Sequence, residues 1–356
     1  MDFTLTEEQD AVRQVAATVF GDLATPERVK EVERSDDRVD RRLWSALAAG
    51  GLIGISVPEG VGGAGLGVTE LCLVLEEQGR RVAPVPLLWS ALGAMALCRA
   101  GAASATAAAA TAATGDLVAR CVAGEAVLTC ALAGDGLSFD RGRVTGEALA
   151  VPYAHVAERV VLAGGGANAA VALADPAGAA REVAEATDRQ LLTHLRFDGA
   201  AVDVVGGAEL VEWLYQRAVV GIAALQLGVA EEALAQAASY TSTRLQFGKP
   251  LSSFQSTSAR AADCYIDIEA MRVTMLQAAW RLDNGLDAST AVEVAKWWAS
   301  EAGERVVQAV QHMHGGLGAD VEYPVHRYFL VGKQLADTLG GASAHLARIG
   351  TALAAR

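Results

Sequence analysis

Two short stretches of the sequence have residue types and spacing that could bind a metal or a dinucleotide. In HMHGG, His312 and His314 are two residues apart. Zinc ligands on one helix face lie four apart, so these histidines point to different faces of a helix. GVGGAGLG at 60–67 formally contains G-x-G-x-x-G, but a dinucleotide fingerprint also needs a preceding strand and an enclosing βαβ unit. The surrounding pattern is helical, which favours a structural glycine loop.

The sequence has no G-x-S-x-G elbow, Walker loop or zinc-protease signature, so serine hydrolase and nucleotidase chemistry lack support. Two further stretches are more specific. RLQFGKPLSSFQ at 244–255 places Arg244 and Phe247 at a turn between two helical patterns, and QHMHGGLG at 311–318 places a glycine pair where a helix ends. Taken singly, Arg244 would be a solvated charge, Phe247 a core residue and the glycines a helix cap.

The elements that must position these stretches follow from the hydrophobic periodicity. Residues 3 to about 118 have a helical pattern that starts at a capping box, Thr6 with Gln9, and the alanine-rich segment near 101–117 favours helix. Valine-rich runs cut by glycine, proline and aspartate predict a small β-domain of hairpins from about 119 to 205. Amphipathic segments then predict an antiparallel four-helix bundle, with helices at 208–243, 251–284, 287–313 and 332–354.

The predicted fold is therefore mainly α with a β middle domain, an α+β class. The predicted domains are an N-terminal helical domain at 1–118, a middle β-domain at 119–205 and a C-terminal helical bundle at 206–356. In the last segment, TLGGAS at 338–343 interrupts alanines and leucines at helical spacing with a second glycine pair, which could be a plain helix end.

Composition and charge exclude several classes of protein. Hydrophobic residues make up 52% and charged residues 20% of 356 residues, which is typical of a packed globular protein. The net charge of −13 argues against nucleic acid as a partner. Five scattered cysteines indicate neither a disulfide framework nor a zinc site and agree with a reducing cytoplasm. The acidic N-terminus is no signal peptide, and charged residues interrupt the apolar stretches, so we expect a cytoplasmic protein without a membrane span.

Taken together and in this order, the motifs resemble the acyl-CoA dehydrogenase family over nearly the whole chain. GLIGISVPEGVGGAGLG and VLEEQGRRVAPVPLL are similar to the family's first helical domain, and RLQFGKPLSSFQ, QHMHGGLG and EYPVHRYF are similar to motifs of its C-terminal bundle. The resemblance implies an FAD enzyme that oxidises acyl-CoA thioesters to 2,3-enoyl-CoA, commonly with an electron-transfer flavoprotein as electron acceptor. The FAD-binding residues that it implies are Arg244, Gln246, Phe247, Leu251, Phe254, His312, Gly315 and Gly316.

Beside the same resemblance, the sequence departs from the family's pattern in three places. The family's reaction needs a carboxylate that removes the proton next to the thioester carbonyl. The usual position of that glutamate falls on Gly340, and the family's second position falls on Gln216, so neither position holds a carboxylate. The family's glutamine in the glycine-pair loop is His312 here, which can still donate a hydrogen bond, with Gln311 one place away. The family's flavin-ring pattern is replaced by LTCALAGDGLSFDRG at 128–142.

The combination resembles the smaller, base-less subunit of actinobacterial heteromeric acyl-CoA dehydrogenases that act on steroid side-chain thioesters. This resemblance implies an α2β2 assembly in which a homologous catalytic subunit supplies the glutamate, the flavin-ring pocket and most of the acyl-CoA site. Two alternatives stay open. The chain could be a self-sufficient homo-oligomeric enzyme with Glu212 or Glu209 as a relocated base, or a non-enzymatic scaffold that kept only the fold.

Overall fold

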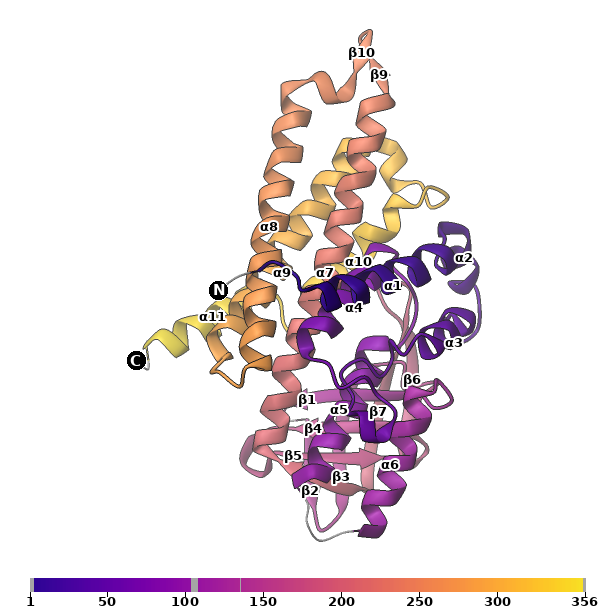
Figure 1. The fold of residues 1–356 in the computed structure, drawn as a ribbon, viewed down its shortest axis with the longest axis vertical. Coiled ribbons are helices and arrows are strands. Elements are labelled where there is room, and N and C mark those ends of the chain that lie inside the picture. Colours follow the sequence, from indigo (N-terminus) through magenta and orange to yellow (C-terminus); the bar gives the residue numbers. More distant parts are fainter. Residues whose placement is uncertain (1–2, 104–107, 135, 355–356) are drawn as a thin grey trace. The chain divides into compact units, whose positions relative to one another are not determined.

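The computed structural model describes residues 3–103, 108–134 and 136–354, and Figure 1 shows its helices and strands. The N-terminal region is helical, as predicted. It starts at the expected capping box, in which Gln9 N–H donates to Thr6 Oγ1 (3.2 Å) and Thr6 N–H donates to Gln9 Oε1 (3.0 Å). Residues 104–107 of the expected alanine-rich helix lie outside the described residues. The helices of this region are α1 (Glu7–Leu23), α2 (Pro26–Val32), α3 (Arg41–Ala49), η1 (Glu59–Val61), α4 (Val68–Arg80), α5 (Leu87–Ala103) and α6 (Ala108–Val122).

The glycine loop at 60–67 is structural. Residues 51–58 form turns rather than a strand, so the element that a dinucleotide fingerprint requires before the glycines is missing. A side chain at Gly63 would overlap the backbone carbonyl of Val57. Glycine is therefore needed here because two backbone segments pass too closely for a Cβ.

Two four-stranded sheets follow, with short helical turns η2 (Gly166–Asn168) and η3 (Pro176–Gly178) between strands. The first sheet has the order β1 (Leu128–Gly134), β4 (Arg159–Gly164), β5 (Ala170–Ala174) and β8 (Asp203–Gly207). The second has the order β2 (Leu137–Asp140), β3 (Arg143–Pro152), β7 (Leu191–Ala201) and β6 (Ala180–Glu185). The predicted hairpins are present as β2–β3, β4–β5 and β6–β7, whereas β1 pairs in parallel with β4, which the sequence did not indicate.

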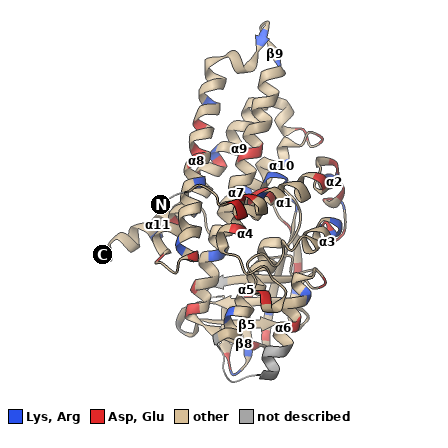
Figure 2. Cartoon of the chain, in the orientation of Figure 1, with Lys and Arg blue, Asp and Glu red and all other residues tan. Residues whose placement is uncertain are grey.

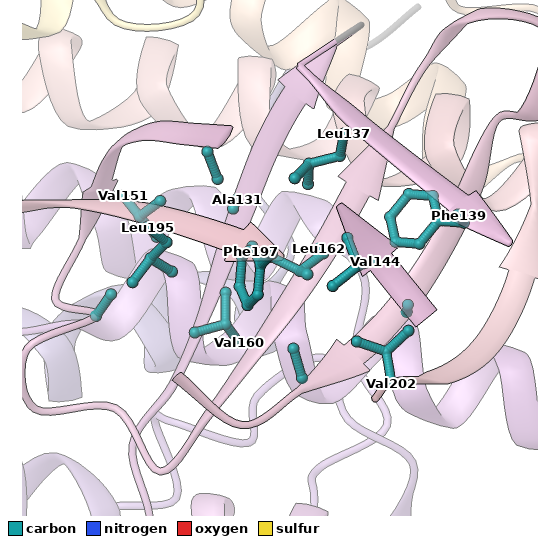
Figure 3. Packing of buried hydrophobic residues seen from close by; sticks show 14 of the residues in the cluster. Ala131, Leu137, Phe139, Val144, Val151, Val160, Leu162, Leu195, Phe197 and Val202 are labelled. Carbon is teal, nitrogen blue, oxygen red and sulfur yellow. The ribbon is translucent and has the colours of Figure 1, made fainter. Parts of the chain in front are cut away.

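The core of this region lies between the two sheets. Figure 3 shows Phe197 and Val144 of the second sheet against Leu162 and Val160 of the first. All four side chains are at most 2% exposed. Burial alternates along β2, which turns one face of that strand inward, whereas β4 and β5 are apolar and buried along nearly their whole length. Burial of these side chains stabilises the pair of sheets.

The C-terminal region is the expected helical bundle, with one correction. Its elements are α7 (Ala208–Thr243), β9 (Leu245–Gln246), β10 (Lys249–Pro250), η4 (Leu251–Ser253), α8 (Gln255–Asp283), α9 (Ser289–His314), η5 (Gly315–Ala319), α10 (Val325–Asp337) and α11 (Ala342–Ala354). The prediction of one helix over 332–354 is wrong. Two helices are present because Leu339 (φ 60°) and Gly340 (φ 107°) adopt left-handed backbone conformations, which a right-handed helix cannot contain. The glycine pair therefore ends α10.

The chain divides into two compact units, each made of more than one segment. The bundle unit comprises Met1–Val29, Cys72–Ala83 and Val219–Arg356, and the sheet unit comprises Lys30–Leu71 and Pro84–Ala218. The order of helical, β and helical regions along the sequence is confirmed. The predicted domain bounds of 1–118, 119–205 and 206–356 stay a prediction.

Within the bundle unit, α4 crosses α7 at two glycines. A Cβ at Gly79 would overlap the carbonyl of Leu225, and a Cβ at Gly228 would overlap the carbonyl of Glu76. Beside this crossing lies a buried ion cluster, in which Arg80 of α4 and Arg272 of α8 both contact Glu231 of α7 and Glu76 of α4. Because each arginine contacts a glutamate of α4 and a glutamate of α7, the cluster links α4, α7 and α8.

Helix α7 is long and apolar enough to cross a membrane by length and composition alone, and 72% of its most apolar window is buried within the protein. Packing accounts for its apolar residues, as it does for the core helix of many globular proteins. Figure 2 shows acidic and basic residues interspersed along the helices, with basic residues at the tip of the α7–α8 hairpin.

Candidate functional site

The α7–α8 hairpin gathers five of the predicted FAD-binding residues at one tip. β9 pairs antiparallel with β10, and Phe247 (φ 53°) and Gly248 (φ 77°) form the two-residue turn between them. Two residues with positive φ are typical of the tight turn that joins antiparallel strands. The Leu251 N–H donates to the Arg244 carbonyl (2.9 Å) and closes the base of the loop. The structure thus brings together Arg244, Gln246, Phe247, Leu251 and Phe254.

The tip presents aromatic and basic groups to solvent. The Phe247 side chain is 91% exposed, which contradicts the interpretation of this residue as a core residue. Its ring meets the Phe254 ring edge-on at 6.2 Å, and the Lys249 ammonium lies 4.3 Å from the centre of the Phe254 ring. Arg244 is also exposed. An aromatic surface beside free guanidinium and ammonium groups suits a planar ring that carries phosphates.

The end of α9 holds the second predicted group. The helix ends at His314, and Gly315 (φ 62°) begins the short helical turn η5. His314 is buried, and its Nδ1 lies 2.9 Å from the Val310 carbonyl. A carbonyl oxygen can only accept, so Nδ1 carries the proton and Nε2 is a buried acceptor with no hydrogen-bond partner in the part of the chain that the structure describes. Burial lowers the pKa of His314 because it disfavours the charged imidazole.

An aromatic stack that the sequence analysis missed joins these two groups. The Tyr240 ring of α7 lies over the His314 ring at 4.7 Å with an angle of 19°, and the Tyr323 ring lies 5.6 Å from His314. Tyr240 is four residues before Arg244, one helical turn away, and its carbonyl accepts from the Arg244 N–H (2.9 Å). The only sequence signal was this spacing, together with a histidine at the last position of a helix.

A hollow of about 640 Å³ lies at the end of α9, lined by Gln308, Gln311, His312, Gly315 and Phe329. Two of the predicted FAD-binding residues, His312 and Gly315, line this hollow. The third predicted residue of this loop, Gly316, is exposed. Gln311, which the sequence placed one residue away from the family's glutamine, has its Oε1 atom buried without a hydrogen-bond partner. A histidine and an amide therefore face the same hollow.

The residues of both groups fit the pyrophosphate and adenine part of FAD. A guanidinium can form paired hydrogen bonds to phosphate, and exposed phenylalanine rings can pack on a base. The unpaired Gln311 Oε1 and His314 Nε2 are acceptors that a bound ligand or water could satisfy. The assignment of these residues to FAD stays a prediction.

The two family positions for the base hold no carboxylate. Gln216 Nε2 donates to Glu212 Oε1 (2.7 Å) on the same face of α7. Gly340 lies in the loop between α10 and α11, where the buried Lys296 donates to its carbonyl (3.1 Å). At 128–142, Thr129 Oγ1 donates to the Pro152 carbonyl (2.6 Å), and its side chain is fully buried. Its hydroxyl therefore bonds within the protein.

Comparison with known proteins identifies the family. The family models for the acyl-CoA dehydrogenase N-terminal domain and C-terminal domain match residues 6–114 and 206–352. Acyl-CoA dehydrogenase FadE27 of Mycobacterium tuberculosis is 38% identical, with 99% of each chain covered. A variant of the Tcur3481–Tcur3483 steroid acyl-CoA dehydrogenase is 42% identical, with a TM-score of 0.92 over 99% of both chains. One chain of the ChsE4–ChsE5 complex from Mycobacterium tuberculosis is 38% identical to this chain, also with a TM-score of 0.92 and with 99% of each of the two chains covered.

Two family models, relatives matched over 99% of the chain and the same fold thus confirm the family that the motifs resemble. The chain belongs to the acyl-CoA dehydrogenase family.

Proposed function

We propose that this chain is a base-less subunit of a heteromeric FAD-dependent acyl-CoA dehydrogenase, and that it acts with a homologous catalytic subunit in an α2β2 assembly. The observation that carries the proposal is the absence of a carboxylate at both family base positions, Gly340 and Gln216. The reaction introduces a double bond next to the thioester carbonyl of an acyl-CoA.

The chemistry explains why this absence matters. The proton next to a thioester carbonyl is weakly acidic, so its removal needs a base within hydrogen-bond reach. Bound FAD would supply the hydride acceptor. Gly340 has no side chain, and the Gln216 amide has no basic group that could take a proton at neutral pH. The partner subunit must therefore supply the base and the surrounding pocket.

The contribution of this chain is binding and positioning. Arg244, Gln246, Phe247, Leu251 and Phe254 at the hairpin, with His312, Gly315 and Gly316 at the end of α9, hold the pyrophosphate and adenine side of FAD. The Tyr240–His314 stack supports this role because it fixes the end of α7 against the end of α9. A rigid pair of helix ends reduces the ordering cost when a ligand binds.

The similar proteins support a partner and a substrate class. One solved relative is a complex of two chains, ChsE4 and ChsE5, and another is described as a steroid acyl-CoA dehydrogenase. By analogy, the partner of this chain is a second acyl-CoA dehydrogenase chain, the substrate is a steroid side-chain CoA thioester, and an electron-transfer flavoprotein accepts the electrons.

The test compares the lone chain with a co-expressed pair. The lone chain should purify with little or no FAD, seen as weak visible flavin absorbance, and no acyl-CoA should bleach it. Co-expression with a homologous dehydrogenase chain should give a yellow complex that an acyl-CoA reduces. Stoichiometric FAD in the lone chain, reducible by an acyl-CoA, would falsify the proposal.

A further inference from the structure

The loop between α10 and α11 has an unusual backbone. Leu339 and Gly340 are consecutive residues with φ of 60° and 107°. A leucine in the left-handed region costs about 1–2 kcal/mol, and such a conformation persists only where the surroundings fix it. The Gly340 N–H donates to the Asp337 carbonyl (3.0 Å), and the Ala344 N–H donates to the Gly341 carbonyl (3.0 Å). The loop is therefore held at its backbone on both sides.

Lys296 of α9 holds the loop from within the protein. Its side chain is fully buried, and Nζ donates to the carbonyls of Ala336 (2.9 Å) and Gly340 (3.1 Å) and to Ser300 Oγ (2.6 Å). Ser300 Oγ in turn donates to the Ala336 carbonyl (2.7 Å). These carbonyls belong to the last turn of α10 and the loop, where helix carbonyls lack partners within the helix. One amino group thus joins the end of α10 to the glycine pair.

His345 of α11 occupies the space next to Gly340. The histidine is fully buried, and its Nδ1–H donates to Glu293 Oε2 of α9 (2.6 Å). Its Nε2 atom, which has no hydrogen-bond partner among the described residues, would lie 3.4 Å from a Cβ at position 340, and Ala344 Cβ would lie equally close. These are ordinary van der Waals distances, so Glu293 holds the imidazole in contact with Gly340, and the positive φ of Gly340 is what disfavours a side chain there.

We propose that Lys296 and the Glu293–His345 pair form a latch that fixes the Leu339–Gly341 loop in its left-handed form, in which a side chain at position 340, a catalytic carboxylate included, is strained. The inference rests on the proposed function and deepens it. The backbone of the base position is fixed by this chain's own residues, so a single Gly340→Glu substitution does not restore a base.

The latch draws on three helices and on charges that face one another. Lys296 and Glu293 come from α9, Asp337 from the end of α10, and His345 and Arg348 from α11, with Arg348 Nη1 3.8 Å from Glu293 Oε2. A plain helix cap would need only one donor at the last carbonyls. Here the same groups also contact the helix that follows the loop, which couples the backbone of position 340 to the packing of α11.

The first test measures hydrogen exchange of the loop amides in the full chain. In Lys296→Met, the amides of Gly340, Ala344 and His345 should exchange at least about tenfold faster, because the carbonyls of the loop lose their shared donor. Lys333→Met removes another lysine of the same bundle, paired with Glu304, and should leave the three amides unchanged. Unchanged loop amides in Lys296→Met, or equal acceleration across the whole bundle, would overturn the proposal.

Ser300→Ala provides a second variant if Lys296→Met fails to fold. It removes the hydroxyl that accepts from Lys296 and donates to the Ala336 carbonyl, while it keeps the lysine. The loop amides should again exchange faster than those of the Lys333→Met control. Exchange at the wild-type rate would contradict the latch.

The second test is a double-mutant cycle between positions 340 and 296. Gly340→Ala should raise the equilibrium constant of unfolding about fivefold more in the Lys296 chain than in a Lys296→Met chain, because a loop without its shared donor can change its backbone to suit alanine. Equal destabilisation in both backgrounds would show that Lys296 does not fix the backbone of position 340. This outcome is separate from the proposed function, which fails only if the wild-type lone chain oxidises an acyl-CoA.

Discussion

The two parts of the bundle that carry family motifs differ in whether their polar groups have hydrogen-bond partners within the protein. At the hairpin and the α9 end, Arg244 and Phe247 are exposed, and Gln311 Oε1 and His314 Nε2 are buried acceptors without partners. At the loop after α10, Lys296 satisfies three backbone carbonyls, and Glu293 fixes His345. Groups left unpaired suit a ligand, whereas groups used within the protein suit a fixed structure.

Under the proposed function, this difference separates a cofactor-binding role that the chain keeps from a catalytic role that it lacks. The hairpin and the α9 end have the exposed guanidinium group and aromatic ring that the binding role needs. The loop offers no carboxylate at position 340, and its left-handed backbone would strain one placed there. The following predictions test each side of this contrast.

Substitution of Arg244 should have the largest effect at the binding end. In the co-expressed complex, Arg244→Ala should weaken FAD retention roughly 10- to 100-fold, because a hydrogen bond to a charged group contributes about 1.5–3 kcal/mol. Arg13→Ala, which removes an exposed arginine paired with Asp10, serves as the control. Dialysis followed by flavin absorbance measures retention. Normal retention in Arg244→Ala would favour the scaffold alternative, in which the fold kept no cofactor contact.

The stability of the protein should depend on pH through Lys296, which holds the loop after α10. Burial lowers the pKa of Lys296 to about 7, although Asp337 and Glu293 favour its charged form. Between this pKa and the ordinary value of about 10.4, the unfolded chain binds more protons than the folded chain, so this group makes stability rise with pH. Below pH 7 both states are protonated, and its contribution is constant.

Chemical denaturation of wild type and Lys296→Met across this pH window isolates the effect. The difference in free energy of unfolding should change by up to about 1.4 kcal/mol per pH unit, in favour of wild type as the pH rises. Other groups titrate in both chains and cancel in the difference. A difference independent of pH would mean that Lys296 stays charged throughout the window.

Two glycines of the C-terminal segment should respond to alanine with opposite signs. Gly340→Ala should destabilise the chain by about 1–2 kcal/mol, since alanine must adopt a φ of 107° beside His345. Gly350 lies inside α11 with open space around it, so Gly350→Ala should stabilise by about 0.5–1 kcal/mol. Thermal unfolding of both variants measures the two changes in stability. Similar small shifts in both would indicate that the loop changes its backbone easily.

The exposed ring of Phe247 should matter for binding and not for stability. Phe247→Ala should change the free energy of unfolding by no more than about 0.5 kcal/mol, because the side chain is 91% exposed. Its loss should weaken FAD retention in the complex about threefold to tenfold if the ring packs on the adenine. Leu353→Ala, at another exposed apolar position, should affect neither property, and a large loss of stability in Phe247→Ala would reveal a packing role instead.

The sequence predicted what short-range patterns determine and missed what distant residues determine. Helical periodicity and turn chemistry placed the capping box, the hairpins and the Arg244 turn. The helix break at Leu339 was not predicted because leucine does not indicate a left-handed backbone. Only the surrounding structure imposes this conformation. Lys296 lies among mostly apolar residues in VEVAKWWASEA, and the backbone carbonyls to which it donates are 39 to 44 residues away. The contact between Tyr240 and His314 has no local signature either.

The smallest expected effect concerns the alternative base on α7. Glu212 is exposed and accepts a hydrogen bond from Gln216 Nε2 (2.7 Å), so a carboxylate does lie beside the family's second position. It belongs to the turn before Gln216, however, about 6 Å along the helix axis. Glu212→Gln should therefore leave the turnover of the complex unchanged within about twofold, and so should Glu209→Gln, which changes the other candidate base. Glu8→Gln, at an exposed acidic residue of α1, serves as the control. A selective loss of turnover in Glu212→Gln would show that this chain supplies the base itself. The contrast between the hairpin with the α9 end and the loop after α10 would then no longer hold.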